Sequence, residues 1–164
     1  MTADAAARGI AENSAQAVAD AVAAGAEFVE SDCHLTRDGV VVLFHDDNLQ
    51  RVLGDPRTLL QVDASELRAL MESRGGLITL EEALVRFPNT RFNIDVKADT
   101  AVQAVGPIVA SHAERVLLTA FSDARRRTAM AAIMRAGANQ RPAASPGTFT
   151  VVKLVIAVWL RARW

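Results

Sequence analysis

The sequence predicts an α/β fold, because segments with strand character alternate with helical segments along most of the chain. Strands are expected at 28–33, 91–97 and 115–120, and helices at 80–87, 101–112 and 123–136. This order is typical of parallel strands joined by crossover helices. A closed α/β barrel takes about 250 residues, so three strands and a hairpin arm predict part of a larger α/β fold.

Composition limits the number of domains and the classes of partner. The chain has 164 residues, which is enough for one core and too few for two ordinary domains, so a single domain over 1–164 is expected. A hydrophobic content of 51% with 23% charged residues is typical of a globular protein. The net charge of −1 offers no basic surface, so a nucleic-acid partner is not expected.

The single cysteine and the apolar runs bear on cellular location. Cys33 excludes a disulfide within the chain and lies in a predicted strand, where we expect it to be buried; a reducing, cytoplasmic setting fits. Residues 1–9 show no secretory signal. The longest apolar run, 151–160, contains Lys153 and is shorter than the ~20 residues that a membrane span needs, so stable membrane insertion is not expected.

The first elements in the chain are a helix, a strand and a hairpin. Asn13 or Ser14 is suited to cap a helix over 15–24. The strand at 28–33 follows directly, and the turn signal Asp38-Gly39 then predicts a hairpin with a second strand at 40–44.

The middle of the chain reads as an insertion followed by a capped helix. The mixed, polar segment 48–77 predicts a loop plus a short helix, for which Asp63 and Glu66 resemble a capping arrangement. Thr79 and Glu82 form a clearer capping box for the helix that follows.

The last third contains two further helix signals and a loop. Gly106-Pro107 is expected to kink or divide the helix over 101–112. Ser122 is suited to cap the next helix, the two prolines of 141–147 predict a loop, and 148–164 predicts a last helix.

Ionisable residues gather near the predicted strands. Glu30 and Asp32 are two residues apart, a spacing that places both side chains on one face of a strand, and Asp95 lies on the polar face of 91–97. Three carboxylates suit a hard cation such as Mg²⁺ or Ca²⁺. His45 at the end of the second strand is suited to proton transfer, and Lys97 to holding a phosphate. The set indicates phosphodiester cleavage.

A structural interpretation competes with this one. A single carboxylate on a strand is more often a surface residue than a ligand, and we expect His34 and His112 to be structural or exposed.

The motifs, taken together, resemble the glycerophosphodiester phosphodiesterase family of (β/α)₈ barrels. The matching segments are ENS at 12–14, GAEFVESDCHLTRDGVVVLFHDDNLQRV at 25–52, ITLEEAL at 78–84, FNIDVK at 92–97 and LTAFSDARRR at 118–127. The resemblance implies a partial TIM barrel with a hairpin and a small insertion after the first visible strand. It also implies hydrolysis of glycerophosphodiesters to an alcohol and glycerol 3-phosphate in lipid metabolism, dependent on Mg²⁺ or Ca²⁺.

The resemblance also assigns roles to the site residues. Glu30 and Asp32 match the metal ligands of the family's E-x-D motif, and His45 matches its second catalytic histidine. Asp95 stands where many members carry a metal-binding glutamate. On the substrate side, the matching residues are Lys97, Glu12 and Asn13.

The sequence departs from the family at both ends. The family's first strand ends in H-R-G, whereas Ala7-Arg8-Gly9 carries alanine in place of the histidine. Either alanine replaces the histidine, or the first strand is absent and Ala7-Arg8-Gly9 matches by chance. We favour the second alternative, and we expect that the closing strands of the barrel are missing from this sequence as well. A positioned acid or base contributes ~10²–10⁴-fold to a rate, so this chain alone is expected to be weakly active or inactive.

Two other functions stay open at this stage. One is an inactive relative that keeps the cation site and binds phosphate esters. The other is an interaction module in which 151–164 docks on a partner, on a second copy or on a membrane surface, because that helix would otherwise expose Val155, Ile156, Trp159 and Leu160.

Overall fold

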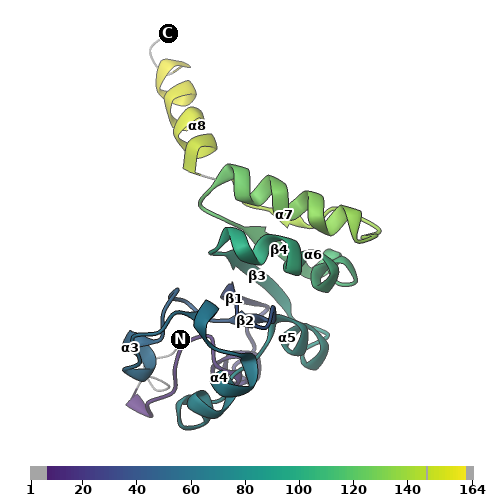
Figure 1. Ribbon diagram of the computed structural model, residues 1–164. Helices are drawn as coiled ribbons and strands as arrows, with labels where there is room; N and C mark the ends of the chain where they lie inside the picture. Colours follow the sequence, from purple (N-terminus) through teal and green to yellow (C-terminus); the bar gives the residue numbers. More distant parts are fainter. Residues whose placement is uncertain (1–6, 147, 162–164) are drawn as a thin grey trace.

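A five-stranded sheet forms the centre of the protein, whose computed structural model describes residues 7–146 and 148–161 (Figure 1). The strands are β1 (Phe28–Leu35), β2 (Val41–Leu43), β3 (Arg91–Val96), β4 (Val116–Thr119) and β5 (Ala143–Ala144). They lie in the order β2-β1-β3-β4-β5. β2 is antiparallel to β1, and the other neighbouring pairs are parallel, which confirms the α/β prediction.

Helices connect the parallel strands. They are α2 (Ala15–Ala23), α5 (Leu80–Arg86), α6 (Val102–Ala110) and α7 (Asp123–Arg135), with short 3₁₀ turns η3 (Asp99–Ala101) and η4 (Ala113–Arg115) on either side of α6. α2 leads into β1 and α5 into β3, while α6 joins β3 to β4 and α7 joins β4 to β5. Figure 1 shows α6 and α7 side by side, in contact with each other. This is the crossover arrangement that the sequence predicted.

The main core lies between the sheet and these helices. Phe92 and Ile94 of β3 and Leu118 of β4 are fully buried, and Val105 of α6 and Ile133 of α7 belong to the same cluster. β4 (VLLT) is nearly all apolar, whereas β3 (RFNIDV) alternates buried apolar residues with Asn93 and Asp95, which it presents on the other face of the sheet.

The segment between β2 and α5 builds a second core. Its elements are α3 (Gln50–Leu53), η1 (Leu59–Gln61), α4 (Ala64–Met71) and η2 (Glu72–Arg74). Successive side chains of a strand point to opposite faces, so Val41 and Leu43 of β2 join the main core, whereas Val42 and Phe44 join the second. The insertion is therefore packed against the hairpin arm.

The predicted helix caps have mixed outcomes. Ser14, rather than Asn13, caps α2 by accepting a hydrogen bond from the Ala17 amide. The capping box of Thr79 and Glu82 is confirmed, with both hydrogen bonds at 3.0 Å. Asp63 precedes α4 but makes no side-chain capping bond, because its carboxylate is paired with Arg37 instead.

The structure differs from two expectations for the last third in part. Gly106-Pro107 does not divide the helix, since α6 runs through Pro107 from Val102 to Ala110. The predicted loop 141–147 contains β5, whose two residues pair with Leu117 and Leu118 of β4. A strand of two residues carries no periodic signal that a sequence reading detects.

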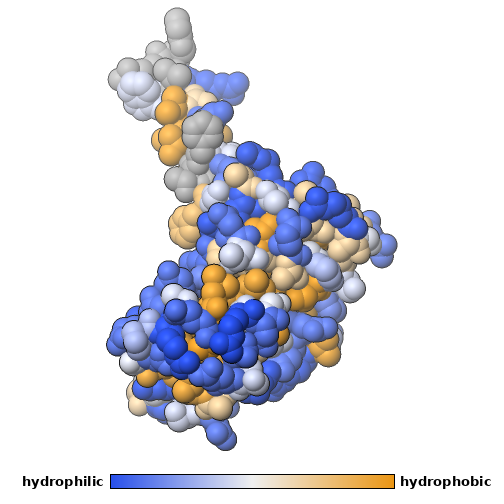
Figure 2. Space-filling view, viewed as in Figure 1, coloured by the Kyte–Doolittle hydropathy of each residue, from blue (hydrophilic) through white to orange (hydrophobic). Residues whose placement is uncertain are grey.

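The last described helix, α8 (Thr148–Arg161), extends away from the rest of the molecule in Figure 1. Thr150 attaches its start to Asp123 of α7 through two hydrogen bonds of 3.3 and 3.2 Å. Val155, Ile156 and Trp159 are exposed as predicted. The Leu160 side chain and residues 162–164 lie outside the described part of the chain. Apolar surface is visible along α8 in Figure 2.

None of the helices in residues 7–146 and 148–161 combines the length and apolar character that crossing a bilayer demands.

Candidate active site

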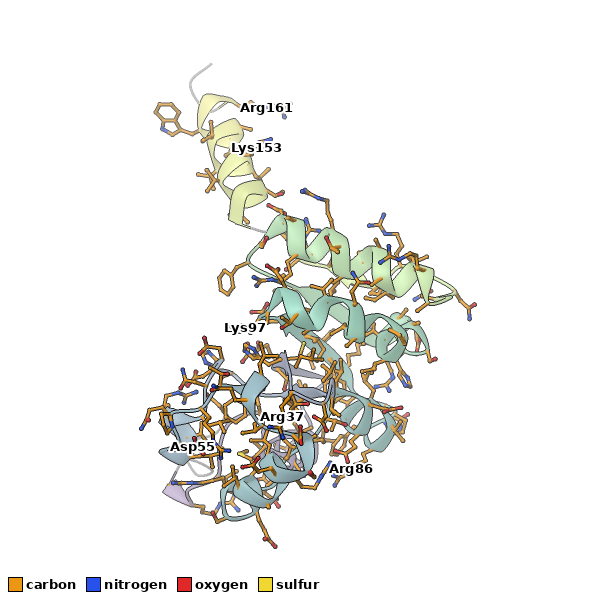
Figure 3. The ribbon with its side chains drawn as sticks, viewed as in Figure 1. Arg37, Asp55, Arg86, Lys97, Lys153 and Arg161 are labelled. Atoms are coloured by element: carbon orange, nitrogen blue, oxygen red, sulfur yellow. The ribbon has the colours of Figure 1, made fainter. Side chains whose placement is uncertain are left out.

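Asp32 and Asp95 face each other across two parallel strands. β1 and β3 pair with Asp32 opposite Asp95 and Glu30 opposite Asn93. Lys97 follows β3, at the level of the sheet in Figure 3, and its Nζ lies 3.0 Å from Asp32 Oδ1 and 3.1 Å from Asp95 Oδ2. Burial acts to lower the pKa of Lys97, but the hydrogen bonds to the two carboxylates outweigh it, so this pKa is raised.

Glu30 is the third carboxylate of the predicted set. Its side chain is open to solvent, yet the surrounding protein raises the pKa of its carboxyl, first by desolvation and next by repulsion from Asp32. Lys97 acts in the opposite direction and does not compensate. Negative charge is therefore concentrated at Glu30 and Asp32.

A cavity of about 420 Å³ opens over these groups. It lies beside β1 and the first turns of α2, and it brings together five of the seven predicted site residues. They are Glu12, Asn13, Glu30, Asp32 and His45. The described residues of its lining include four carboxylates, the fourth being that of Asp20, and no lysine or arginine. Such a lining favours a cation.

Asn13 holds Asp32 in place. Its Nδ2 donates to Asp32 Oδ2 at 3.1 Å, and its Oδ1 accepts from the Asp32 amide at 3.3 Å. Asn13 has a φ of 58°, and it is the only residue other than glycine with a positive φ in the described part of the chain. Asparagine tolerates this left-handed conformation better than most residues do. The backbone of Asn13 is thus adapted to the contact.

His45 follows β2 and lines the same cavity. Its Nδ1 lies 2.6 Å from Asp46 Oδ1. Its backbone oxygen lies 3.2 Å from Nε2 of His34. Burial lowers the pKa of His34, so the neutral ring is favoured and is able to donate to this carbonyl. His34 has the structural role that was expected.

Lys97 and Asp95 lie next to this cavity without belonging to its described lining. In residues 7–146 and 148–161, no three His, Cys, Asp or Glu side chains are grouped as in a metal site. The donor set nevertheless fits a hard cation: carboxylate oxygens converge from β1 and β3, and Asp95 Oδ1 is buried without a hydrogen-bond partner. The Lys97 ammonium occupies the position between Asp32 and Asp95.

Two residues near His45 were missed by the sequence analysis. Asp46 contacts the imidazole, and Arg51 binds both Asp46 and Glu12. The signal was present in the dense H-D-D sequence at 45–47. The contact between Arg51 and Glu12 could not be inferred from the sequence, because the two residues lie 39 positions apart.

Comparison with protein families gives a match over most of the chain. The sequence model of the "Glycerophosphoryl diester phosphodiesterase family" matches residues 4–142.

Curated relatives point to the same family. "Probable glycerophosphodiester phosphodiesterase 2" of Mycobacterium tuberculosis is 33% identical over 154 residues, which is 92% of this chain and 54% of the relative. Human "Lysophospholipase D GDPD1" is 37% identical over 105 residues, which is 56% of this chain and 33% of the relative. The chain thus spans about half the length of the first of these relatives and a third of the second.

Solved structures share the fold. The crystal structure of a glycerophosphodiester phosphodiesterase from Thermotoga maritima aligns with a TM-score of 0.63 at 31% identity, over 74% of this chain and 52% of that chain. An Oleispira antarctica phosphodiesterase, solved with its product sn-glycerol-3-phosphate, aligns with a TM-score of 0.64 at 20% identity, over 82% and 60%. The five-stranded sheet is accordingly part of a TIM-barrel fold.

Proposed function

The chain belongs to the glycerophosphoryl diester phosphodiesterase family, and from this premise we propose that it serves the metal-dependent hydrolysis of a glycerophosphodiester to an alcohol and glycerol 3-phosphate. The names of the two curated relatives, "Probable glycerophosphodiester phosphodiesterase 2" and "Lysophospholipase D GDPD1", support this class of reaction. A role in lipid metabolism is part of the proposal.

One observation carries it: the cavity collects Glu30, Asp32 and His45 and is lined by carboxylates. An anionic phosphate diester would be repelled by this lining unless a cation intervened. A cavity of this size and polarity is suited to a small phosphate ester held through such a cation.

Glu30, Asp32 and Asp95 would hold the cation, Mg²⁺ or Ca²⁺. Such a cation neutralises phosphate charge and lowers the pKa of a bound hydroxyl or water. Asp95 Oδ1, buried without a partner, supports its assignment as a ligand. The cation would compete with the Lys97 ammonium for the oxygens of Asp32 and Asp95.

The other site residues would act on the substrate and on the proton. His45 would exchange a proton with the reacting oxygen through Nε2, since Nδ1 is engaged by Asp46. Lys97 would add positive charge toward the phosphate. Asn13 and Glu12 line the cavity where the substrate would lie, and both also support neighbouring groups.

The proposal treats residues 1–164 as one domain, which the continuous main core around β1, β3 and β4 supports. A cytoplasmic setting belongs to the same proposal and is supported by the free, buried thiol of Cys33, whose pKa is raised by burial.

Calorimetry with Mg²⁺ and with Ca²⁺ tests the cation site directly. The chain should bind one cation, and Glu30→Gln and Asp32→Asn should each abolish the binding. Glu114→Gln is a matched control, because Glu114 is a largely exposed carboxylate on a different element. Binding that survives both site variants would refute the proposed cation site.

Release of glycerol 3-phosphate from glycerophosphocholine tests the reaction. Turnover should require the cation and should be lost in His45→Gln without loss of cation binding. Cation binding together with binding of the ester, but with no turnover even at high enzyme concentration, would instead support the non-catalytic relative.

We also propose that α8 is covered by a partner or by a second copy of the chain. Exposed Val155, Ile156 and Trp159 support this, since apolar patches of this kind on soluble proteins mark contact surfaces. Replacing Val155 and Ile156 by serine should make the chain more soluble and monomeric in analytical ultracentrifugation. An unchanged association state would count against self-association.

A further inference from the structure

The side chains around His45 form a connected chain of contacts that reaches from the hairpin arm to the segment before α2. We propose that Asp46, held in place by Arg51, is a positioning residue that fixes the tautomer of His45 with the proton on Nδ1 and the lone pair on Nε2. The inference rests on the proposed function only for its catalytic consequence.

The contact between His45 and Asp46 sets which nitrogen is available. Nδ1 lies 2.6 Å from Asp46 Oδ1, which is a short hydrogen bond, and hydrogen bonds to charged groups are shorter than those between neutral groups. The His45 side chain is about half exposed and lines the cavity, whereas Asp46 lies deeper, at 20% exposure. With Nδ1 engaged, Nε2 is the ring nitrogen left for chemistry in the cavity.

Arg51 immobilises the Asp46 carboxylate. Its Nε donates to Asp46 Oδ2 at 2.7 Å, and its Nη2 donates to Asp46 Oδ1 at 3.1 Å. A guanidinium that contacts both oxygens of a carboxylate fixes its plane as well as its position. Asp46 is therefore presented to the imidazole in one orientation.

The same contacts keep Asp46 ionised. Hydrogen bonds from Arg51, with a smaller one from His45, lower the pKa of Asp46 to about 2 against the opposing effect of burial. An ionised carboxylate has only acceptors, so the partner atom, His45 Nδ1, must carry a proton at neutral pH. The geometry and the charge state thus lead to the same tautomer.

Glu12 anchors the arginine from the other side. Arg51 Nη2 donates to Glu12 Oε1 as well as to Asp46. Glu12 precedes α2, Arg51 belongs to α3, and His45 follows β2, so three separate segments are joined at this point. The contact indicates that Glu12 supports Arg51 in addition to any contact with substrate.

Replacing Asp46 by asparagine tests the proposal, because it should change which ring nitrogen of His45 carries the proton. Arg51 requires an acceptor, so the side-chain amide introduced by Asp46→Asn should turn its oxygen to Arg51 and its NH₂ to His45. Nδ1 would then have to accept, and the proton would move to Nε2. Removing the arginine as well, in Asp46→Asn with Arg51→Met, frees the amide to turn back and should restore the original tautomer.

The readout is ¹⁵N NMR of histidine-labelled protein at neutral pH, which distinguishes protonated from unprotonated ring nitrogens. We expect Nδ1–H in the unaltered chain, Nε2–H in Asp46→Asn, and a return to Nδ1–H in the double variant. Asp47→Asn is the matched control, because Asp47 is the adjacent carboxylate and contacts Asn48 rather than His45. An Nε2–H tautomer in the unaltered chain, or an Asp46→Asn spectrum like that of the control, would overturn the proposal.

Activity measurements distinguish a failure of this inference from a failure of the proposed function. If the chain hydrolyses glycerophosphocholine, Asp46→Asn should lower kcat by about 10–100-fold with KM unchanged, as expected of an orienting group, and the double variant should recover part of the loss. A tautomer switch in a chain without turnover would support the positioning role and refute the proposed hydrolysis. Turnover that does not respond to the switch would refute a catalytic use of Nε2.

Discussion

Asp32 and Asp95 are register partners on adjacent parallel strands, and their carboxylates share one ammonium, that of Lys97. Both carboxylates are nearly buried, with 8% and 7% of their side chains exposed. Two buried carboxylates at this separation repel each other unless a positive group lies between them. The structure uses a lysine for this purpose, and the proposed function requires that a divalent cation be able to replace it.

Replacing Lys97 by methionine should therefore destabilise the chain. Removing one partner of a buried ion pair leaves an uncompensated charge, and we expect the free energy of unfolding to fall by about 3 kcal/mol. Urea unfolding at neutral pH measures the change. Arg127→Met on the exposed surface of α7 is the control, for which we expect a change within about 0.5 kcal/mol.

The same variant distinguishes a structural role of these carboxylates from a cation site. Mg²⁺ or Ca²⁺ should restore more stability to Lys97→Met than it adds to the unaltered chain, because ligand binding to the folded state alone raises stability. Equal effects of the cation on both proteins would show that Lys97 and the cation do not compete.

Asn13 should affect cation affinity through Asp32. Asn13→Gly removes both hydrogen bonds to Asp32, while glycine keeps the positive φ without strain. Groups that orient metal ligands typically contribute 10–100-fold to affinity, so we expect calorimetry to show a loss of about that size. Unchanged affinity would mean that the strand alone orients Asp32.

The lowered pKa of His112 should make the stability of the chain depend on pH. Burial, followed by the nearby Arg115, lowers the pKa of His112 below its ordinary value of 6.5, and the neutral Nδ1 lies 3.1 Å from Arg115 Nη2. A lowered folded-state pKa means that this stabilisation is fully present above pH 6.5 and is lost as pH falls through the folded-state value.

The comparison with His112→Gln isolates this effect. The variant keeps an acceptor for Arg115 but cannot take up a proton, so its urea midpoint should fall less than that of the unaltered chain between about pH 8 and about pH 5. His34, whose pKa is also lowered by burial, is present in both proteins and cancels. Parallel pH curves would contradict the prediction.

Replacing Gly106 by alanine should change the free energy of unfolding in the direction opposite to the usual one for a helix. Glycine to alanine within a helix normally stabilises by about 1 kcal/mol. At Gly106 a Cβ atom would lie 2.9 Å from the carbonyl carbon and oxygen of Ala132, so α6 and α7 would have to separate. We expect Gly106→Ala to destabilise the chain by about 1–3 kcal/mol in thermal or urea unfolding. A stabilised variant would contradict the close helix contact.

Local features of the fold were predictable from the sequence because they depend on near neighbours. The alternation of strands and helices, the hairpin at Asp38-Gly39 and the capping box of Thr79 and Glu82 follow from periodicity and short-range hydrogen bonds. Asp63 lies at the N-cap position of α4, but its side chain makes no capping hydrogen bond because it pairs with Arg37, which lies 26 residues away in the sequence. The two-residue strand β5 was missed because only its pairing with β4 defines it.

By itself, the sequence determined the α/β class and the family resemblance, and it selected the residue types of the site: three carboxylates, a histidine and a lysine. These follow from composition, spacing and motif order. Only the tertiary structure decided the pairings. Lys97 lies between Asp32 and Asp95, Ser14 caps α2 and leaves Asn13 to hold Asp32, and Arg51 joins Glu12 to Asp46 beside His45. The physical reason is that charge compensation and hydrogen bonding depend on distance in space. That distance is set by the register of the strands and by the way the connecting segments fold back on the sheet.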